Sequence, residues 1–250
     1  MKIVYIGASD GLAETVIERM SQEGNDVYLL SDNALSDAPK KGPLHRYYRS
    51  PRKGQTFENL LRSLSPDCVI FAGKQSMGDA KGEDADQDIM LLARSLRALD
   101  ASPHTRFVLL SSTDVYGNTE GAAQESTPCL PATERGLRFV QEEQLLEMHQ
   151  QQRGLDGVIL RISQLYTDKP EEGHVDFLSR SFTDAIEAKS PLTADVLQPL
   201  HVADLADAIK RVMDAGEGVY NVAGGGCCIQ GICMSSYVKK KSFQNDLFNG

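Results

Sequence analysis

The chain has 250 residues, of which 41% are hydrophobic, and its formal net charge at pH 7 is −9. This length suits one α/β domain with at most a small additional lobe, and the apolar content is sufficient for a core, which argues against disorder. The acidic balance argues against binding to a nucleic-acid backbone, which requires clustered lysine and arginine side chains. No apolar run approaches the roughly 20 residues that a membrane-spanning helix needs.

Strand-like and helix-like segments alternate along the chain. Short, continuously apolar strands separated by helices predict a parallel sheet covered on both faces, and right-handed crossovers make it a Rossmann-type, doubly wound α/β fold. The predicted strands are residues 3–6, 27–30, 68–72, 107–110, 158–162 and 219–222, with a weak strand near 45–48, and the predicted helices are 12–20, 57–64, 89–99, 131–152 and 202–213.

The predicted domain organisation is simple. Residues 1–225 form the domain, including a reduced substrate lobe to which about residues 163–200 contribute, and residues 226–250 form an unpatterned C-terminal tail. The acidic stretch from Gly82 to Asp88 is expected to be a solvated loop that leads into a helix, not a metal site.

The five cysteines indicate reduced thiols. Cys68 lies in an apolar run and Cys129 in a loop. Cys227, Cys228 and Cys233 cluster without a second Cys or His pair at zinc spacing. The chain passes from Met-Lys directly into a strand, which leaves no room for a signal peptide. We therefore expect a cytoplasmic protein that holds no metal.

A glycine-containing loop follows the first predicted strand and precedes a helix, in the run Gly-Ala-Ser-Asp-Gly-Leu-Ala. Gly7 permits a tight turn, and Gly11 lets the backbone approach a pyrophosphate at the helix N-terminus, where free N–H groups and the helix dipole favour an anion. Asp10 opposes this unless its carboxylate points away. The predicted dinucleotide-binding residues here are Gly7, Ser9, Asp10, Gly11 and Leu12, and the alternative is an ordinary turn without a ligand.

Asp32 ends the second predicted strand, about twenty residues after the glycine loop. Its carboxylate can accept hydrogen bonds from the adenosine ribose hydroxyls, which favours NAD over NADP. A turn or capping role is the alternative. Basic residues in the next loop could hold a 2′-phosphate, so NADP stays open as a second choice; these residues are Lys40, Lys41, Arg46, Arg49, Arg52 and Lys53.

Five further stretches carry a resemblance to a known family. They are 66–73 (PDCVIFAG), 111–117 (SSTDVYG), 160–166 (LRISQLY), 200–209 (LHVADLADAI) and 219–222 (VYNV). In this order and spacing they resemble the extended short-chain dehydrogenases/reductases, which include the NAD-dependent epimerases and dehydratases of nucleotide sugars. The resemblance implies additional cofactor contacts from Phe71, Ala72, Gly73, Ser111 and Ile162.

The same resemblance implies a catalytic Ser or Thr, Tyr and Lys. The hydroxyl polarises the substrate oxygen, the tyrosine is the general base or acid, and the lysine lowers the tyrosine's pKa and holds the ribose. Ser112 matches the hydroxyl, with Thr113 as its rival. The helix expected to read Tyr-Gly-x-Ser-Lys-x-x-x-Glu has Arg135 at the tyrosine position and Phe139 at the lysine position, while Glu143 keeps the register.

Arg135 cannot replace a tyrosine, because it stays protonated and offers only hydrogen-bond donors. It could instead clamp an anionic substrate group, with Ser112 or Thr113 as donor and another group as base. Tyr166 with Lys169 is a poor substitute pair because of its spacing of three in a loop. His201 is expected to cap or pack, not to act as a base.

The leading prediction is an NAD-binding family member with variant or impaired oxidoreductase or epimerase chemistry on a sugar nucleotide or a related hydroxy/keto compound. One alternative is a non-catalytic dinucleotide sensor or subunit that acts through a protein partner, and another is a chain without any ligand. By the resemblance, a homodimer would pair through the helices near residues 89–99 and 135–150.

Overall fold

The computed structural model describes residues 1–7, 11–30, 48–49, 56–73, 82–100, 102, 104–119, 121–166, 196–224 and 228–229. The predictions made for Ser9, Asp10, Asp32 and Lys169 lie outside these residues. So do most of the predicted substrate lobe and nearly all of the predicted tail.

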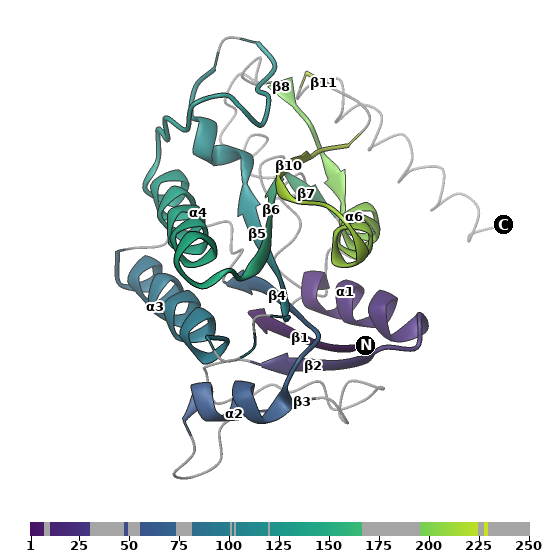
Figure 1. Ribbon diagram of the computed structural model, residues 1–250. Coiled ribbons are helices and arrows are strands. Elements are labelled where there is room, and N and C mark those ends of the chain that lie inside the picture. Colours follow the sequence, from purple (N-terminus) through teal and green to yellow (C-terminus); the bar gives the residue numbers. More distant parts are fainter. Residues whose placement is uncertain are drawn as a thin grey trace, which may run out of the picture.

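A parallel sheet of seven strands forms the centre of the described structure, with the order β10-β6-β5-β4-β1-β2-β3 (Figure 1). The order reverses between β1 and β4, the point where doubly wound sheets bind ligands at the carboxyl ends of their strands. The strands are β1 (Lys2–Gly7), β2 (Asp26–Leu30), β3 (Tyr48–Arg49), β4 (Cys68–Gly73), β5 (Arg106–Ser112), β6 (Asp156–Ile162) and β10 (Gly218–Val222). The predicted Rossmann-type fold is confirmed.

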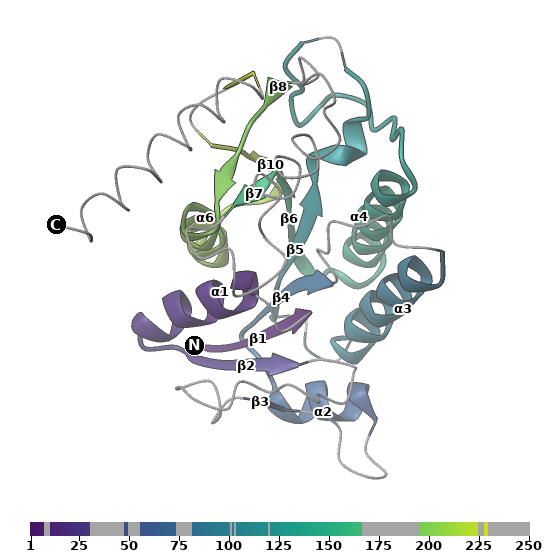
Figure 2. The same cartoon turned by 180° about the vertical axis from the view of Figure 1, so that it is seen from behind.

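Helices cover both faces of this sheet (Figures 1 and 2). On one face α1 (Gly11–Gln22) packs against α6 (Val202–Asp214). The other face carries α2 (Phe57–Leu64), α3 (Gly82–Ala98) and α4 (Glu134–Arg153). Two small pairings lie outside the main sheet: β7 (Leu165–Tyr166) with β9 (Leu200–His201), and β8 (Val196–Leu197) with β11 (Cys228–Ile229).

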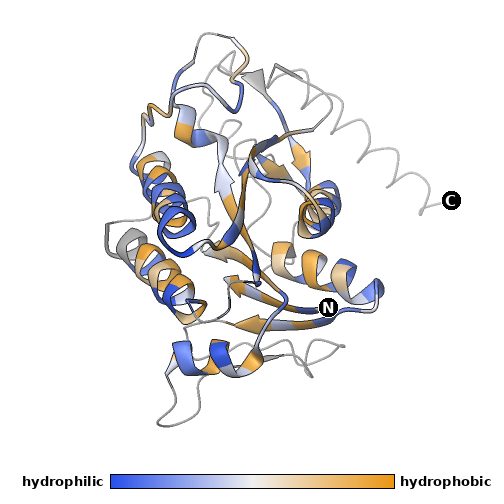
Figure 3. Ribbon diagram, viewed as in Figure 1, coloured by the Kyte–Doolittle hydropathy of each residue, from blue (hydrophilic) through white to orange (hydrophobic). Residues whose placement is uncertain are grey.

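The alternation of side chains along each strand divides the core in two. Ile3 and Tyr5 point into the layer beneath α1 and α6, whereas Val4 and Ile6 point into the layer beneath α2 and α3. Strands buried on both faces therefore have nearly continuous apolar sequences, and in Figure 3 much of β1, β2 and β4 is orange, between helices of mixed colour. None of the helices in the described ranges is long and apolar enough to cross a membrane.

Side-chain caps fix where the helices near the site begin. The hydroxyl of Thr133 accepts a hydrogen bond from the Gly136 N–H (3.0 Å), and α4 ends at Gly154 with a left-handed φ of 70°. Nδ1 of His201 accepts from the Ala203 N–H (3.2 Å) at the start of α6. The predicted capping role of His201 is confirmed.

One prediction from the sequence needs correction. The weak strand expected at residues 45–48 meets β3 at its last residue, and β3 pairs with the end of β2; residues 45–47 lie outside the described residues. The stretch from Gly82 to Asp88 opens α3, which agrees with the predicted helix start, but Asp88 is buried (3% exposed), so the expected solvation was wrong for this residue. The physical reason is an ion pair with Arg138 of α4, which allows the carboxylate to be buried.

Arg106 joins the start of β5 to the end of α6. Its guanidinium donates to the carbonyl oxygens of Val212 (2.9 and 2.7 Å) and Gly216 (2.5 Å), and it pairs with the carboxylate of Asp156 at the start of β6. The side chain is buried, so these acceptors offset the cost of removing the charge from water.

Gly117 should be indispensable for the loop that follows β5. It has a φ of 63° and follows the short 3-10 helix η2 (Thr113–Tyr116), and a Cβ added there would collide with the carbonyl oxygen of Leu130. We expect Gly117→Ala to lower the free energy of unfolding by more than about 2 kcal/mol. Gly121 has a φ of 89° but open space around it, so Gly121→Ala is the matched control and should cost less. Equal losses in urea unfolding would contradict the prediction.

Candidate functional site

The end of β1 meets the end of β4 at the point where the strand order reverses. A Cβ on Gly7 would lie 2.8 Å from the carbonyl oxygen of Gly73, a distance that real Cβ contacts essentially never show. Gly73 itself has a left-handed φ of 55°. Beside them α1 begins at Gly11, and Leu12, the second residue of this helix, is buried (1% exposed). Only glycine can therefore occupy position 7 at this crossing of the two strand ends.

The remaining predicted cofactor residues lie at neighbouring strand ends. Phe71 and Ala72 end β4, Ser111 lies in β5, and Ile162 ends β6. All four side chains are at most 4% exposed, and the ring of Phe71 stacks on that of Phe107 with centroids 6.3 Å apart. Phe71 and Ser111 are fully buried (0% exposed), so neither residue presents a surface to a ligand in this structure.

Ser112 and Thr113 stand where β5 passes into η2. The hydroxyl oxygen of Ser112 accepts a hydrogen bond from the Asp114 N–H (3.2 Å), which caps η2. Because this oxygen accepts the hydrogen bond, the hydroxyl proton of Ser112 stays available for a further acceptor. Its side chain is buried (4% exposed), whereas Thr113 is half-buried. Of the two predicted donors, Ser112 is the one that the protein holds in place.

Arg135 lies in the first turn of α4 and forms an ion pair with Asp114 of η2. Its guanidinium carbon lies 5.2 Å from the centroid of the Phe139 ring. Burial lowers the pKa of Arg135, and the charge of Asp114 opposes this shift. Its Nε is buried, without a hydrogen-bond partner among the described residues. The anion that Arg135 holds in this structure is thus one of the protein's own carboxylates.

Phe139, which takes the expected lysine position, is part of the core. It is 1% exposed and packs with Val115 and Tyr116 in a small cluster beneath η2. The guanidinium carbon of Arg138 lies 4.5 Å from its ring centroid, so two arginines of α4 flank one aromatic ring.

A buried cluster of charges lies between α3 and α4. Arg138 pairs with Asp88 at 2.6 Å and with Glu142 at 3.6 Å, and all three side chains are at most 4% exposed. Burial raises the pKa of Glu142 to about 8, and the charge of Arg138 opposes this shift while Asp88 and Glu143 add to it. At neutral pH Glu142 is therefore mostly protonated and neutral. The positive charge of Arg138 is then balanced by the negative charge of Asp88.

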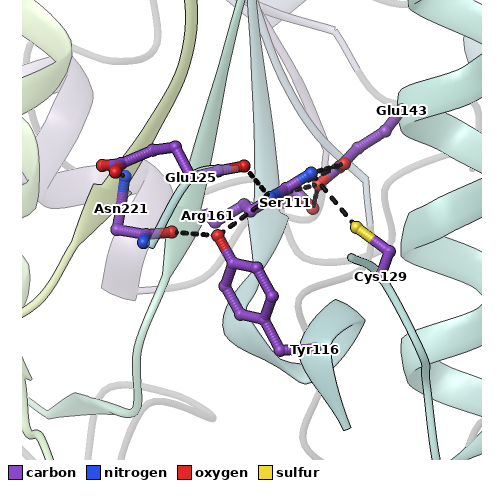
Figure 4. Close-up of polar contacts among 7 residues, drawn as sticks. All are labelled: Ser111, Tyr116, Glu125, Cys129, Glu143, Arg161 and Asn221. Carbon is purple, nitrogen blue, oxygen red and sulfur yellow. Dashed lines mark hydrogen bonds and ion pairs between the residues drawn. The ribbon is translucent and has the colours of Figure 1, made fainter. Parts of the chain in front are cut away.

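A second buried network joins β5, β6, η2 and α4 around Arg161 (Figure 4). Glu143 accepts from Arg161 Nη2 (2.7 Å) and Nε (3.0 Å), and from the hydroxyl of Ser111 (2.5 Å). Arg161 Nη1 also donates to the Tyr116 hydroxyl (2.8 Å), which in turn donates to Asn221 of β10 (2.7 Å).

The same network fixes the loop between η2 and α4. Arg161 donates to the sulfur of Cys129 (3.2 Å) and to the carbonyl oxygen of Glu125 (3.2 Å). The Glu125 carboxylate accepts from the Asn221 N–H (2.9 Å), and this hydrogen bond lowers the pKa of Glu125. Sequence reasoning missed this network, although an arginine inside an apolar strand is a signal that an acidic partner must be near. No metal-binding group of three or more His, Cys, Asp or Glu is found among the described residues.

Glu142 should make the stability of the protein depend on pH. Its pKa is about 8 in the folded protein and 4.5 ordinarily, so below pH 4.5 both states are protonated and nothing is lost. As the pH rises from 4.5 to 8 the unfolded chain ionises first, and the free energy of unfolding falls until both states are charged. We expect Glu142→Gln to remove this fall and to stabilise the protein at about pH 8 by at least about 1 kcal/mol.

Urea unfolding at several pH values would measure the effect of Glu142→Gln. Glu147→Gln removes an exposed carboxylate from the same helix and serves as the control, whose pH profile should match that of the unmodified protein. Superimposable profiles for Glu142→Gln and the unmodified protein would show that Glu142 does not carry the pH dependence.

Comparisons with known proteins agree with this architecture. The family model described as the NAD dependent epimerase/dehydratase family matches residues 3–223. An uncharacterized UDP-glucose epimerase of Bacillus subtilis, YtcB, is 27% identical over 180 residues, which are 66% of this chain. The match spans 57% of that relative's length.

Solved structures share the fold at low sequence identity. The UDP-glucose 4-epimerase of Thermus thermophilus, in complex with NAD, aligns with a TM-score of 0.75 at 20% identity, over 96% of this chain and 83% of that one. The dTDP-glucose 4,6-dehydratase of Bacillus anthracis, also in complex with NAD, aligns with a TM-score of 0.77 at 19% identity, over 96% and 80%. With the family model matching most of its length, the chain belongs to the NAD dependent epimerase/dehydratase family.

Proposed function

We propose that the protein binds a nicotinamide dinucleotide at the carboxyl ends of β1, β4 and β5, with a sugar nucleotide or a related hydroxy/keto compound beside it, and that it lacks the phenolate chemistry of its family. The observation that supports this proposal is that Arg135 and Phe139 occupy the positions of the expected tyrosine and lysine and are both engaged within the protein. Arg135 is paired with Asp114, and Phe139 is buried against η2. Neither can accept a proton from a substrate hydroxyl.

The cofactor part of the proposal rests on the glycine turn. The tight contact of Gly7 with Gly73 and the start of α1 beside it suit a pyrophosphate at the helix N-terminus. Solved relatives of the same fold are complexes with NAD. NAD is proposed over NADP because the Asp32 carboxylate suits free ribose hydroxyls.

In the proposed reaction, the bound cofactor would accept the hydride, and the protein would hold the substrate in position beside it. Ser112, with its proton free, would donate to the substrate oxygen, and Thr113 is its less constrained neighbour. Phe139 offers no donor to the ribose. We propose that the substrate and the cofactor bind, but that hydride transfer between them is impaired or depends on a base other than the usual tyrosine.

The second candidate function is a dinucleotide-binding sensor or subunit that acts through a partner. Exposed apolar side chains on the outer faces of α3 and α4 favour it: Met90 is 63% exposed, Leu137 49% and Met148 44%. A second copy of the chain, paired through these helices as sequence analysis predicts for residues 89–99 and 135–150, is the simplest partner.

The proposal keeps the domain division predicted from the sequence, with residues 1–225 as the cofactor-binding domain and about 163–200 as its substrate lobe. It also keeps the cytoplasm as the location. Cys68 and Cys129 are free thiols, and burial raises the pKa of Cys68 to about 12, which makes it inert. Unpaired cysteines suit a reducing compartment.

Binding of NADH and NADPH tests the proposed cofactor. We expect NADH to bind in the micromolar range and more tightly than NADPH, with a gain in nicotinamide fluorescence and in Tm. Asp32→Ala is expected to weaken NADH binding more than NADPH binding, and Arg19→Met, on the exposed face of α1, should alter neither. No stabilisation by either dinucleotide would overturn the proposal.

The reaction can be tested on the same samples. Addition of UDP-glucose to the protein with bound NAD is expected to leave the cofactor oxidised, because Arg135 accepts no proton. Appearance of NADH absorbance, or of an epimerised sugar, would show that another base acts in this site and that the chemistry is intact.

Pairing through α3 and α4 is tested by the molecular mass in solution. We expect Leu137→Glu to convert a dimer into a monomer, because a charge would be buried in the contact. Leu130→Glu, at a more exposed apolar residue outside these helices (72% exposed), is the control and should leave the mass unchanged. A monomer of the unmodified protein at micromolar concentration would exclude this partner.

A further inference from the structure

A row of contacts leads from the glycine turn to the buried charges between α3 and α4. The carbonyl oxygen of Gly73 lies against Gly7, and a Cβ built on Gly73 would lie 3.4 Å from the carboxylate of Asp88. Asp88 pairs with Arg138 at 2.6 Å, and Arg138 faces Glu142, one turn further along α4, at 3.6 Å. Only the side chains of Asp88 and Arg138 therefore separate Glu142 from the end of β4, where the dinucleotide is proposed to bind.

Glu142 is a carboxylate in excess of the arginines around it. Three arginines of this region are already held by a carboxylate, in the pairs Arg138–Asp88, Arg161–Glu143 and Arg135–Asp114. Within the described part of the chain Glu142 is the fourth carboxylate beside these three cations, and its buried Oε1 accepts no hydrogen bond there. The charges of this region balance when Glu142 carries a proton, and ionisation of Glu142 leaves one negative charge in excess.

We infer that the cluster of Asp88, Arg138 and Glu142 couples dinucleotide binding to the uptake of a proton by Glu142. The inference rests on the proposed function and deepens it, because it makes the affinity at the end of β4 depend on pH. The coupling is electrostatic and requires no movement of the backbone.

The direction of the coupling follows from the charges of the ligand. The pyrophosphate of a dinucleotide is anionic, and the nicotinamide ring of NADH is uncharged. Negative charge placed against Gly73 disfavours a further negative charge on Glu142, and the displacement of water from the end of β4 reduces the screening between them. NADH therefore favours the protonated form of Glu142, so its binding should take up protons and should weaken as the pH rises.

The pH range of the effect is set by Glu142. Burial raises the pKa of Glu142 to about 8 in the free protein, and bound NADH should raise this pKa further. The affinity for NADH should then be constant well below pH 8 and fall above it. The other charged groups that act on Glu142 are Arg135, Arg138 and Glu143 of α4 and Asp88 of α3, and each of them is held in an ion pair.

Calorimetric titration with NADH in two buffers of different ionisation enthalpy measures the protons taken up. We expect about 0.3 proton or more per NADH bound at pH 8, and a Kd at least about threefold higher at pH 9 than at pH 7. Glu142→Gln has the shape of the protonated acid. It should bind NADH at pH 7 like the unmodified protein, keep that affinity at pH 9 and lose the proton uptake.

Glu147→Gln removes an exposed carboxylate from the same helix and is the matched control, which should behave like the unmodified protein. Asp88→Asn tests the route through the cluster. Without this carboxylate Arg138 becomes the partner of Glu142, which favours the ionised form of Glu142. The proton uptake should then move to lower pH, while NADH still binds.

The outcomes separate the coupling from the proposed function. If the unmodified protein binds no NADH between pH 7 and pH 9, the proposed function fails and the coupling fails with it. If NADH binds without proton uptake, or with the same uptake in Glu142→Gln as in the unmodified protein, the coupling alone is overturned.

Discussion

The buried pair of Glu143 and Arg161 is the interaction on which the site depends. Arg161 lies inside β6, where an unpaired guanidinium would cost several kcal/mol. Burial alone would lower the pKa of Arg161, but hydrogen bonds with Glu143 and Tyr116 raise it above its usual value. Because its donors reach η2, α4 and the loop that carries Cys129, these elements are held at fixed positions relative to the sheet. The placement of the residues at the start of α4 follows from that constraint.

The same helix reverses the usual distribution of polarity. The buried side chains of α4 include Arg138, Glu142 and Glu143, whereas Leu137 and Met148 face outward. Buried ion pairs therefore hold it to the protein together with the apolar contacts of Phe139 and Leu146. The pairing of Arg135 with Asp114 adds another ion pair at the start of this helix.

Much of the fold follows from local sequence, because strands buried on both faces must be continuously apolar and helices between them must be amphipathic. The order and spacing of the family motifs also placed Ser112, Arg135 and Phe139 correctly along the elements. What local patterns could not reveal were partners distant in sequence. The burial of Asp88 depends on Arg138, fifty residues away, and the contact of Arg135 with Asp114 depends on how α4 packs on η2. Such pairs are visible only once the sheet has brought the elements together.

Arg106 has a consequence for the order in which the chain acquires its structure. It lies at the start of the fifth strand, yet the carbonyl oxygens that satisfy its guanidinium belong to residues 212 and 216. A nascent chain that ends after β6 can pair these strands and form the ion pair of Arg106 with Asp156, but the carbonyl acceptors at residues 212 and 216 have not yet been synthesised. We therefore expect the buried surroundings of Arg106 to be completed only when α6 has been synthesised.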